Sequence, residues 1–120
     1  MMKTSCLLTL LLVLASCARQ PAEPTGIYRL GTADKTMVLD VRASGVYVLQ
    51  IDGPDSMTDE IRGRWDDGPD TTIDATFHGI VWHGQEPEAG KGLWPVSFER
   101  DGGICVDGEG LLCFTKDGKA

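Results

Sequence analysis

Hydrophobic and polar residues alternate along much of the chain after Thr25, and this alternation predicts β-strands. Large apolar residues occupy every second position from Met37 to Val41, and the same period returns from Tyr47 to Ile51 after a glycine-containing turn. These two runs predict a β-hairpin. Further strands are expected at 26–30, 60–66, 71–77, 80–83 and 93–99, and in the two arms of a hairpin at 104–114. No segment has a sustained helical period, so the pattern indicates an all-β domain.

Turn residues between these short strands extend the prediction to the architecture. The chain contains 15 Gly and 6 Pro, which favour many turns over long helices. A succession of about eight short antiparallel strands favours a meander that curls into a small barrel or sandwich. We therefore expect a single β-domain at residues 25–120.

A glycine followed two residues later by an aromatic residue occurs three times. A Gly-x-Tyr-x-Leu pattern at 26–30 recurs at 45–49, and a shorter Gly-x-Trp form lies at 63–65. The glycine lies on the same strand face as the ring, where it leaves room for a neighbouring ring and lets the strand curl. We expect the rings to pack the interior of the domain, and the alternative is that they line a ligand cavity.

Residues 1–16 have a different pattern, that of a secretory signal peptide. One positive charge, Lys3, precedes an apolar run from Cys6 to Leu14, and small residues follow. As a helix this run would be about 14 Å long, too short for a hydrocarbon core of about 30 Å. We expect the segment to be removed rather than retained as a membrane anchor.

The end of this segment, Leu14-Ala15-Ser16-Cys17, resembles the lipobox of bacterial lipoproteins. The resemblance implies that Cys17 becomes the first residue, carries diacylglycerol on its sulfur and a further acyl chain on its amine, and anchors the protein in a lipid bilayer. Ala18 stands where members retained in the inner membrane usually have Asp, which implies an outer-membrane anchor with the domain facing the periplasm. Residues 17–24 would form the lipidated cysteine and a tether of at most about 25 Å. The alternative is an ordinary signal peptide cut before a cysteine that forms a disulfide.

The cysteine count agrees with the lipoprotein interpretation. Of 4 Cys, Cys6 would leave with the signal and Cys17 would be acylated, so Cys105 and Cys113 remain as a pair in an oxidising compartment. If they face each other across the hairpin, a three-residue loop at 108–110 is left, with Gly110 free to adopt a left-handed conformation. We predict a disulfide that stabilises this hairpin. A redox-active or metal-binding pair is the alternative, although such pairs usually have Cys-x-x-Cys spacing.

Charge and motif content argue against several function classes. The chain has 11 Lys+Arg against 18 Asp+Glu, a formal net charge of -7, which argues against nucleic acid as a partner. No serine lies in a Gly-x-Ser-x-Gly or Ser-x-x-Lys motif, and no phosphate-binding loop or dinucleotide fingerprint occurs. We therefore expect a protein that is not an enzyme and that has no cofactor.

Metal binding is not expected either. His78 and His83 are five residues apart, which places them on opposite faces of a continuous strand, and joint ligation would require a bulge at Gly79. Two Asp-Gly-Pro-Asp runs, at 52–55 and 67–70, are rich in carboxylates. They lack the alternating acidic spacing and distant Glu of a calcium loop and are typical of turns.

One segment suggests a binding surface. Residues 83–95 are expected to form a long polar loop that ends in Trp94-Pro95. Loops on a rigid sheet often carry recognition, and an exposed Trp can serve as an anchor. The candidate binding residues are Glu86, Glu88, Lys91 and Trp94. The alternative is a mobile connector whose Trp94 packs into the core.

The glycine–aromatic series at 26–65 resembles the β-meander of small lipocalin-like lipoprotein domains, such as the N-terminal domain of envelope-stress and copper-homeostasis outer-membrane lipoproteins. The copper function of those proteins relies on a Cys-x-x-Cys pair that this chain lacks, so no copper site is implied. We expect a non-enzymatic envelope lipoprotein whose β-domain binds a protein or a small ligand. The alternative, by fold-level analogy, is a periplasmic inhibitor of a protease or lysozyme, which a protruding loop at 84–92 would favour.

Overall fold

The computed structural model describes residues 23–54, 58–68, 72–107, 110 and 112–117. All regular secondary structure in these residues is β-strand, which confirms the predicted all-β class. The strands are β1 (Gly26–Gly31), β2 (Thr36–Val41), β3 (Val46–Asp52), β4 (Thr58–Asp67), β5 (Ala75–His83), β6 (Glu86–Val96), β7 (Ile104–Cys105) and β8 (Cys113–Lys116). The described residues contain no helix that is long and apolar enough to cross a membrane. Cys17 and the predicted signal peptide lie outside the described residues.

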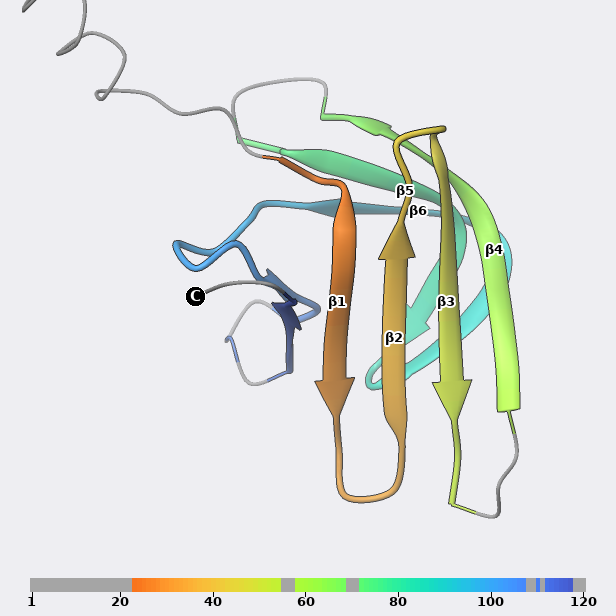
Figure 1. Cartoon of the computed structure of the whole chain (residues 1–120). Helices are drawn as coiled ribbons and strands as arrows, with labels where there is room; N and C mark the ends of the chain where they lie inside the picture. Colours follow the sequence, from red (N-terminus) through yellow and green to blue (C-terminus); the bar gives the residue numbers. More distant parts are fainter. Residues whose placement is uncertain (1–22, 55–57, 69–71, 108–109, 111, 118–120) are drawn as a thin grey trace, which may run out of the picture.

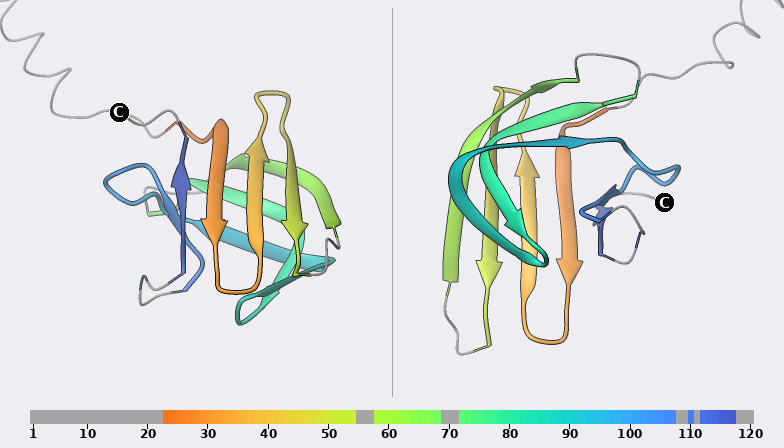
Figure 2. Two further views of the ribbon diagram at one scale, coloured as in Figure 1. Left: turned by 60° about the horizontal axis from the view of Figure 1, so that its bottom comes forward. Right: turned by 180° about the vertical axis from the view of Figure 1, so that it is seen from behind.

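The strands form one antiparallel sheet in the order β6-β5-β4-β3-β2-β1-β8-β7. Strands β1 to β6 follow one another as a meander, and the β7–β8 hairpin returns to place β8 beside β1. The sheet curls into a half-barrel, in which β5 and β6 pass behind β1 to β3 (Figure 1). The view from behind shows the same two strands crossing over the concave side of the sheet (Figure 2).

The sheet bends at β4, because this strand changes its partner along its length. Its first part, up to Arg64, pairs with β3, and its last part, from Trp65, pairs with β5. Gly63 lies just before the change, directly opposite Tyr47. The Tyr47 ring covers the bare face of Gly63, and its hydroxyl donates a 2.8 Å hydrogen bond to the carbonyl oxygen of His78. The prediction that glycine makes room for a neighbouring ring is thus confirmed at this position.

The other two glycines of the series do not play this part. The face of Gly26 lies against the Lys116 side chain, and nothing but a backbone oxygen comes near that of Gly45. Both have positive φ, of 144° and 92°. Here glycine is required by the backbone conformation at the start of β1 and in the β2–β3 turn, not by a ring.

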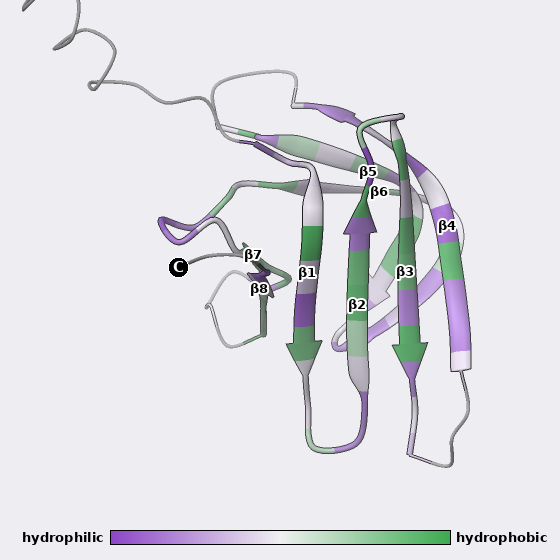
Figure 3. Cartoon of the chain, in the orientation of Figure 1, coloured by the Kyte–Doolittle hydropathy of each residue, from purple (hydrophilic) through white to green (hydrophobic). Residues whose placement is uncertain are grey.

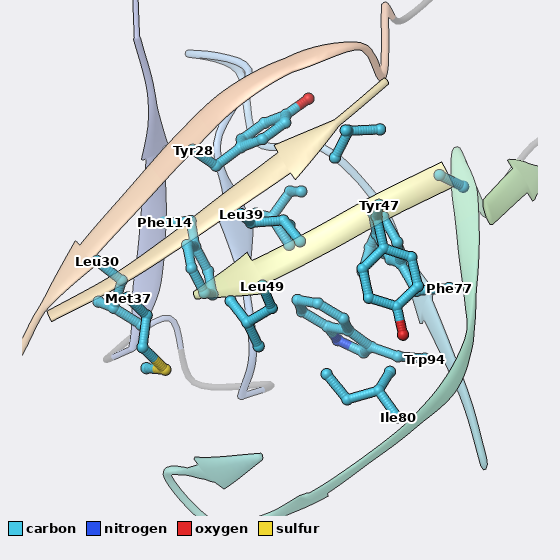
Figure 4. Packing of buried hydrophobic residues seen from close by; sticks show 14 of the residues in the cluster. Tyr28, Leu30, Met37, Leu39, Tyr47, Leu49, Phe77, Ile80, Trp94 and Phe114 are labelled. Carbon is cyan, nitrogen blue, oxygen red and sulfur yellow. The ribbon is translucent and has the colours of Figure 1, made fainter. Parts of the chain in front are cut away.

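Hydrophobic side chains from the concave face of the sheet form a single core. Figure 3 shows hydrophobic residues recurring along β1, β2 and β3, which supply part of this core. Tyr28 and Tyr47 are fully buried in it, so the predicted packing role of these rings is confirmed. The ring of Trp94 lies beside that of Phe77, with a centroid distance of 5.1 Å (Figure 4). It also contacts the ring of Trp82, at 5.0 Å between centroids. The buried cluster consists of Tyr28, Leu30, Met37, Leu39, Val41, Tyr47, Leu49, Ile61, Ala75, Phe77, Ile80, Trp94, Val96, Ile104, Leu112 and Phe114.

The C-terminal hairpin has the predicted disulfide and register. Cys105 is paired with Cys113 across β7 and β8, with an S–S distance of 2.05 Å and Cα atoms 3.9 Å apart. Gly110 has a φ of 75°, the left-handed conformation expected of it. An isolated β-bridge between Phe98, just after β6, and Ile104 of β7 then brings the two edge strands of the sheet together.

Two predictions about the segment from 71 to 95 are wrong. The strands expected at 71–77 and 80–83 form one strand, β5, which has a bulge between His78 and Ile80 where Gly79 takes a φ of 88°. The loop expected at 83–95 is mostly β6, joined to β5 by a turn at Gly84-Gln85. The first half of β6 is exposed and so lacks an apolar alternation, but β5 supplies its backbone partners.

Candidate functional site

An open groove of about 560 Å³ lies at one end of the half-barrel, where the β1–β2 turn, the residues at the end of β3 and the start of β4, and the tip of the β5–β6 hairpin come together. In a meander, alternate turns share an end of the sheet, which is why segments far apart in sequence meet there. The described residues that line it are Asp34, Lys35, Ile51, Gly53, Pro54, Thr58, Asp59 and Glu86.

Lys35 forms one wall of the groove. Its side chain is only 7% exposed, and its ammonium group pairs with the carboxylate of Glu86, the first residue of β6. This ion pair joins the β1–β2 turn to the tip of the β5–β6 hairpin. The turn itself is held by Thr32, whose backbone N–H donates to the carbonyl of Lys35 at 2.8 Å and whose hydroxyl donates to Asp34 at 2.9 Å.

The remaining lining combines an apolar floor with an acidic rim. Ile51 packs against the hydrophobic core, and Pro54 continues the apolar surface. Asp34 and Asp59 are exposed, and no described residue forms a salt bridge with either carboxylate. The groove is therefore lined by three carboxylates and one ammonium group, and that ammonium group is already paired with Glu86. The groove is suited to a ligand that has both apolar surface and positive charge.

The structure does not bring the four predicted binding residues together. Glu86 lines the groove, but Glu88 pairs with His83 at 3.1 Å on the exposed side of the hairpin. Lys91 is exposed on β6, whereas Trp94 is only 7% exposed and belongs to the core. The alternative that Trp94 packs into the core is thus confirmed.

The two histidines do not lie on opposite faces, because the bulge at Gly79 inverts the alternation of β5. Ile80 is fully buried, and both histidines are on the exposed side. His78 contacts a carboxylate oxygen of Asp66 at 2.8 Å, and His83 contacts Glu88. Among the described residues, no group of three or more His, Cys, Asp or Glu side chains is arranged to hold a metal ion.

Asp34 and Asp59 were missed as site residues because each resembles an ordinary polar turn or strand-end residue. The signal that could have found them is topological, since the register of the meander places both at the same end of the sheet.

No known protein family, curated protein or solved structure matches the chain.

Proposed function

We propose that the protein is a bacterial envelope lipoprotein, anchored in the outer membrane through acylated Cys17, whose periplasmic β-domain is a non-catalytic binding module. The observation that carries the proposal is the position of the groove relative to the tether. Strand β1 begins at Gly26, beside the tether, and ends at Gly31, beside the turn that lines the groove (Figure 1). Six extended residues span about 17 to 20 Å, so an anchored domain would present the groove away from the lipid surface.

The last two residues before Thr25 and β1, Glu23 and Pro24, are hydrogen-bonded to the fold. The Tyr28 hydroxyl donates a 2.6 Å hydrogen bond to the carbonyl oxygen of Pro24, and the Lys116 ammonium group donates to that of Glu23 at 2.5 Å. A short tether before these residues keeps the domain close to the membrane, and its attachment at this end favours an outward-facing groove.

The packed core supports recognition at the surface rather than inside the half-barrel. Tyr28, Tyr47 and Phe77 are fully buried in it. The alternative function, inhibition of a hydrolase, would be favoured by a protruding loop at 84–92. That segment belongs instead to the β5–β6 hairpin, whose tip is tied to the β1–β2 turn by Lys35 and Glu86.

Anchoring is tested by metabolic labelling with a fatty-acid analogue followed by membrane fractionation. We expect the wild-type protein to take up label and to fractionate with membranes, and Cys17→Ser to lose both properties. Cys6→Ser is the matched control, because this cysteine would leave with the signal peptide, and it should behave as wild type. Unlabelled wild-type protein, or label that persists in Cys17→Ser, would contradict the proposed anchor.

The binding surface is tested by photo-crosslinking in intact cells. A crosslinking residue replaces Asp34 or Thr58 in the groove, or Ser44 in the β2–β3 turn at the other end of the sheet. We expect the two groove positions to capture the same molecule and Ser44 to capture none of it. No adduct from the groove, or equal capture from Ser44, would count against this site.

A further inference from the structure

We propose that the groove binds an extended segment of a partner protein that carries Lys or Arg beside an apolar side chain. This inference depends on the proposed function, since it names the partner of the same groove.

The charges favour a cationic partner. Lys35 is buried and paired with Glu86, so it does not offer a free positive charge to an acidic ligand. Asp34 and Asp59 stay on the rim without a salt bridge to any described residue. A Lys or Arg side chain could form charge-assisted hydrogen bonds with them. The net charge of -7 would also speed the approach of a basic segment.

The floor and shape favour a peptide chain with an apolar side chain next to the basic one. Ile51 and Pro54 give the groove an apolar surface that a purely polar cation would leave in contact with water. The groove is open and lies between three separate turn regions, and its volume of about 560 Å³ is within the range of ligand sites. An extended chain can enter such a groove from the side.

The test uses protein expressed from the full sequence and purified from whichever cell fraction contains it, so it does not depend on the anchor. Three dye-labelled hexapeptides serve as probes in fluorescence anisotropy: one of alternating Lys and Leu, one with Glu for Lys, and one with Ser for Leu. We expect only the Lys–Leu peptide to bind. Binding of the Lys–Ser peptide with equal affinity, or no binding of the Lys–Leu peptide at low salt, would overturn the proposal.

Variants then locate the binding. Asp34→Asn combined with Asp59→Asn should weaken the affinity for the Lys–Leu peptide by roughly tenfold or more, because two charge-assisted contacts are lost. The matched control, Asp66→Asn with Asp67→Asn, makes the same change in charge at the far end of β4 and should leave the affinity within about twofold. An equal loss of peptide affinity in the two double variants would mean that net charge alone attracts the peptide. That result would contradict a site in the groove.

A small cation is the competing occupant, and spermidine provides the test. If spermidine displaces the Lys–Leu peptide with a dissociation constant equal to that of the peptide, a polyamine is sufficient for binding. That result would overturn the proposal of a protein segment. Failure of these peptide experiments leaves the lipid labelling at Cys17 unaffected, so the inference and the proposed anchor fail independently.

Discussion

At Gly63, the space in which a side chain would begin is already occupied. A Cβ atom there would lie 2.3 Å from the carbonyl oxygen of His78 and 2.7 Å from the nearest carbon of the Tyr47 ring. The first of these neighbours is backbone, and the ring is fixed by the hydrogen bond from its hydroxyl to the same carbonyl. The bend of the sheet at β4 therefore requires a residue without a Cβ atom at position 63.

Gly63→Ala should lower the free energy of unfolding by about 1 to 3 kcal/mol, because the extra carbon overfills a packed region and displaces Tyr47. Gly31→Ala is the matched control: its added carbon would have no described neighbour within 4 Å, so its effect should stay within about 1 kcal/mol. Urea denaturation followed by circular dichroism measures both. Equal stability of the two variants would mean that the close contact at Gly63 is not what shapes the bend.

The β5–β6 hairpin is the element that differs most from its sequence prediction. Its inner half places Trp94 among the rings of Phe77, Trp82 and Phe114, while the neighbouring Leu93 is 64% exposed. This alternation at adjacent positions is what a strand with one buried face produces. A mobile connector would not distinguish the two residues so sharply.

Trp94→Ala should therefore cost about 3 to 5 kcal/mol of unfolding free energy, whereas Leu93→Ala should change it by no more than about 0.5 kcal/mol. Chemical denaturation with tryptophan fluorescence measures Leu93→Ala, and circular dichroism measures Trp94→Ala. If Trp94→Ala fails to fold, trypsin sensitivity of the two variants in cell extract gives the same ranking. Similar behaviour of the two variants would support the loop interpretation.

The disulfide acts on a second element, the β7–β8 hairpin. Replacing both cysteines, Cys105→Ser and Cys113→Ser, should lower the unfolding free energy by about 2 to 3 kcal/mol, the value expected for releasing a loop this short. Hydrogen exchange should accelerate at Ile104 and Phe114 before it does so in β2 and β3. A reductant should reproduce the loss in wild type and have no further effect on the double variant. Unchanged stability in the double variant would remove the predicted structural role.

The success of the sequence predictions depended on how an element is buried. Strands β1 to β3 bury one face, so their alternation was readable, and the pairing of Cys105 with Cys113 followed from a hairpin with a glycine loop. The first half of β6 is exposed and carries no such pattern. Of the predicted binding residues only Glu86 lines the groove. Asp34 and Asp59 lie near Glu86 because of the register of the meander, which proximity in sequence does not reveal.

At the scale of the whole molecule, the two tyrosines of the chain report on the integrity of the half-barrel. Burial raises the pKa of Tyr47 to about 12, and burial together with the nearby charge of Glu23 raises that of Tyr28 to about 12. An unfolded chain would release both protons near the ordinary pKa of 10. The folded state thus holds these protons more tightly. The stability that the two tyrosines contribute is fully present below pH 10 and is lost as the pH rises toward 12.

We therefore expect alkaline unfolding between pH 10 and 12 in which the ultraviolet absorbance of tyrosinate and the loss of β-sheet circular dichroism change together, because neither tyrosine can ionise readily inside the core. Tyr28→Phe with Tyr47→Phe is the comparison. Measured against its own stability at neutral pH, this double variant should lose less unfolding free energy in that interval than wild type does. Tyrosinate that forms near pH 10 while the circular dichroism stays native would show that the rings reach solvent in the folded state. That result would be incompatible with a core built around Tyr28 and Tyr47.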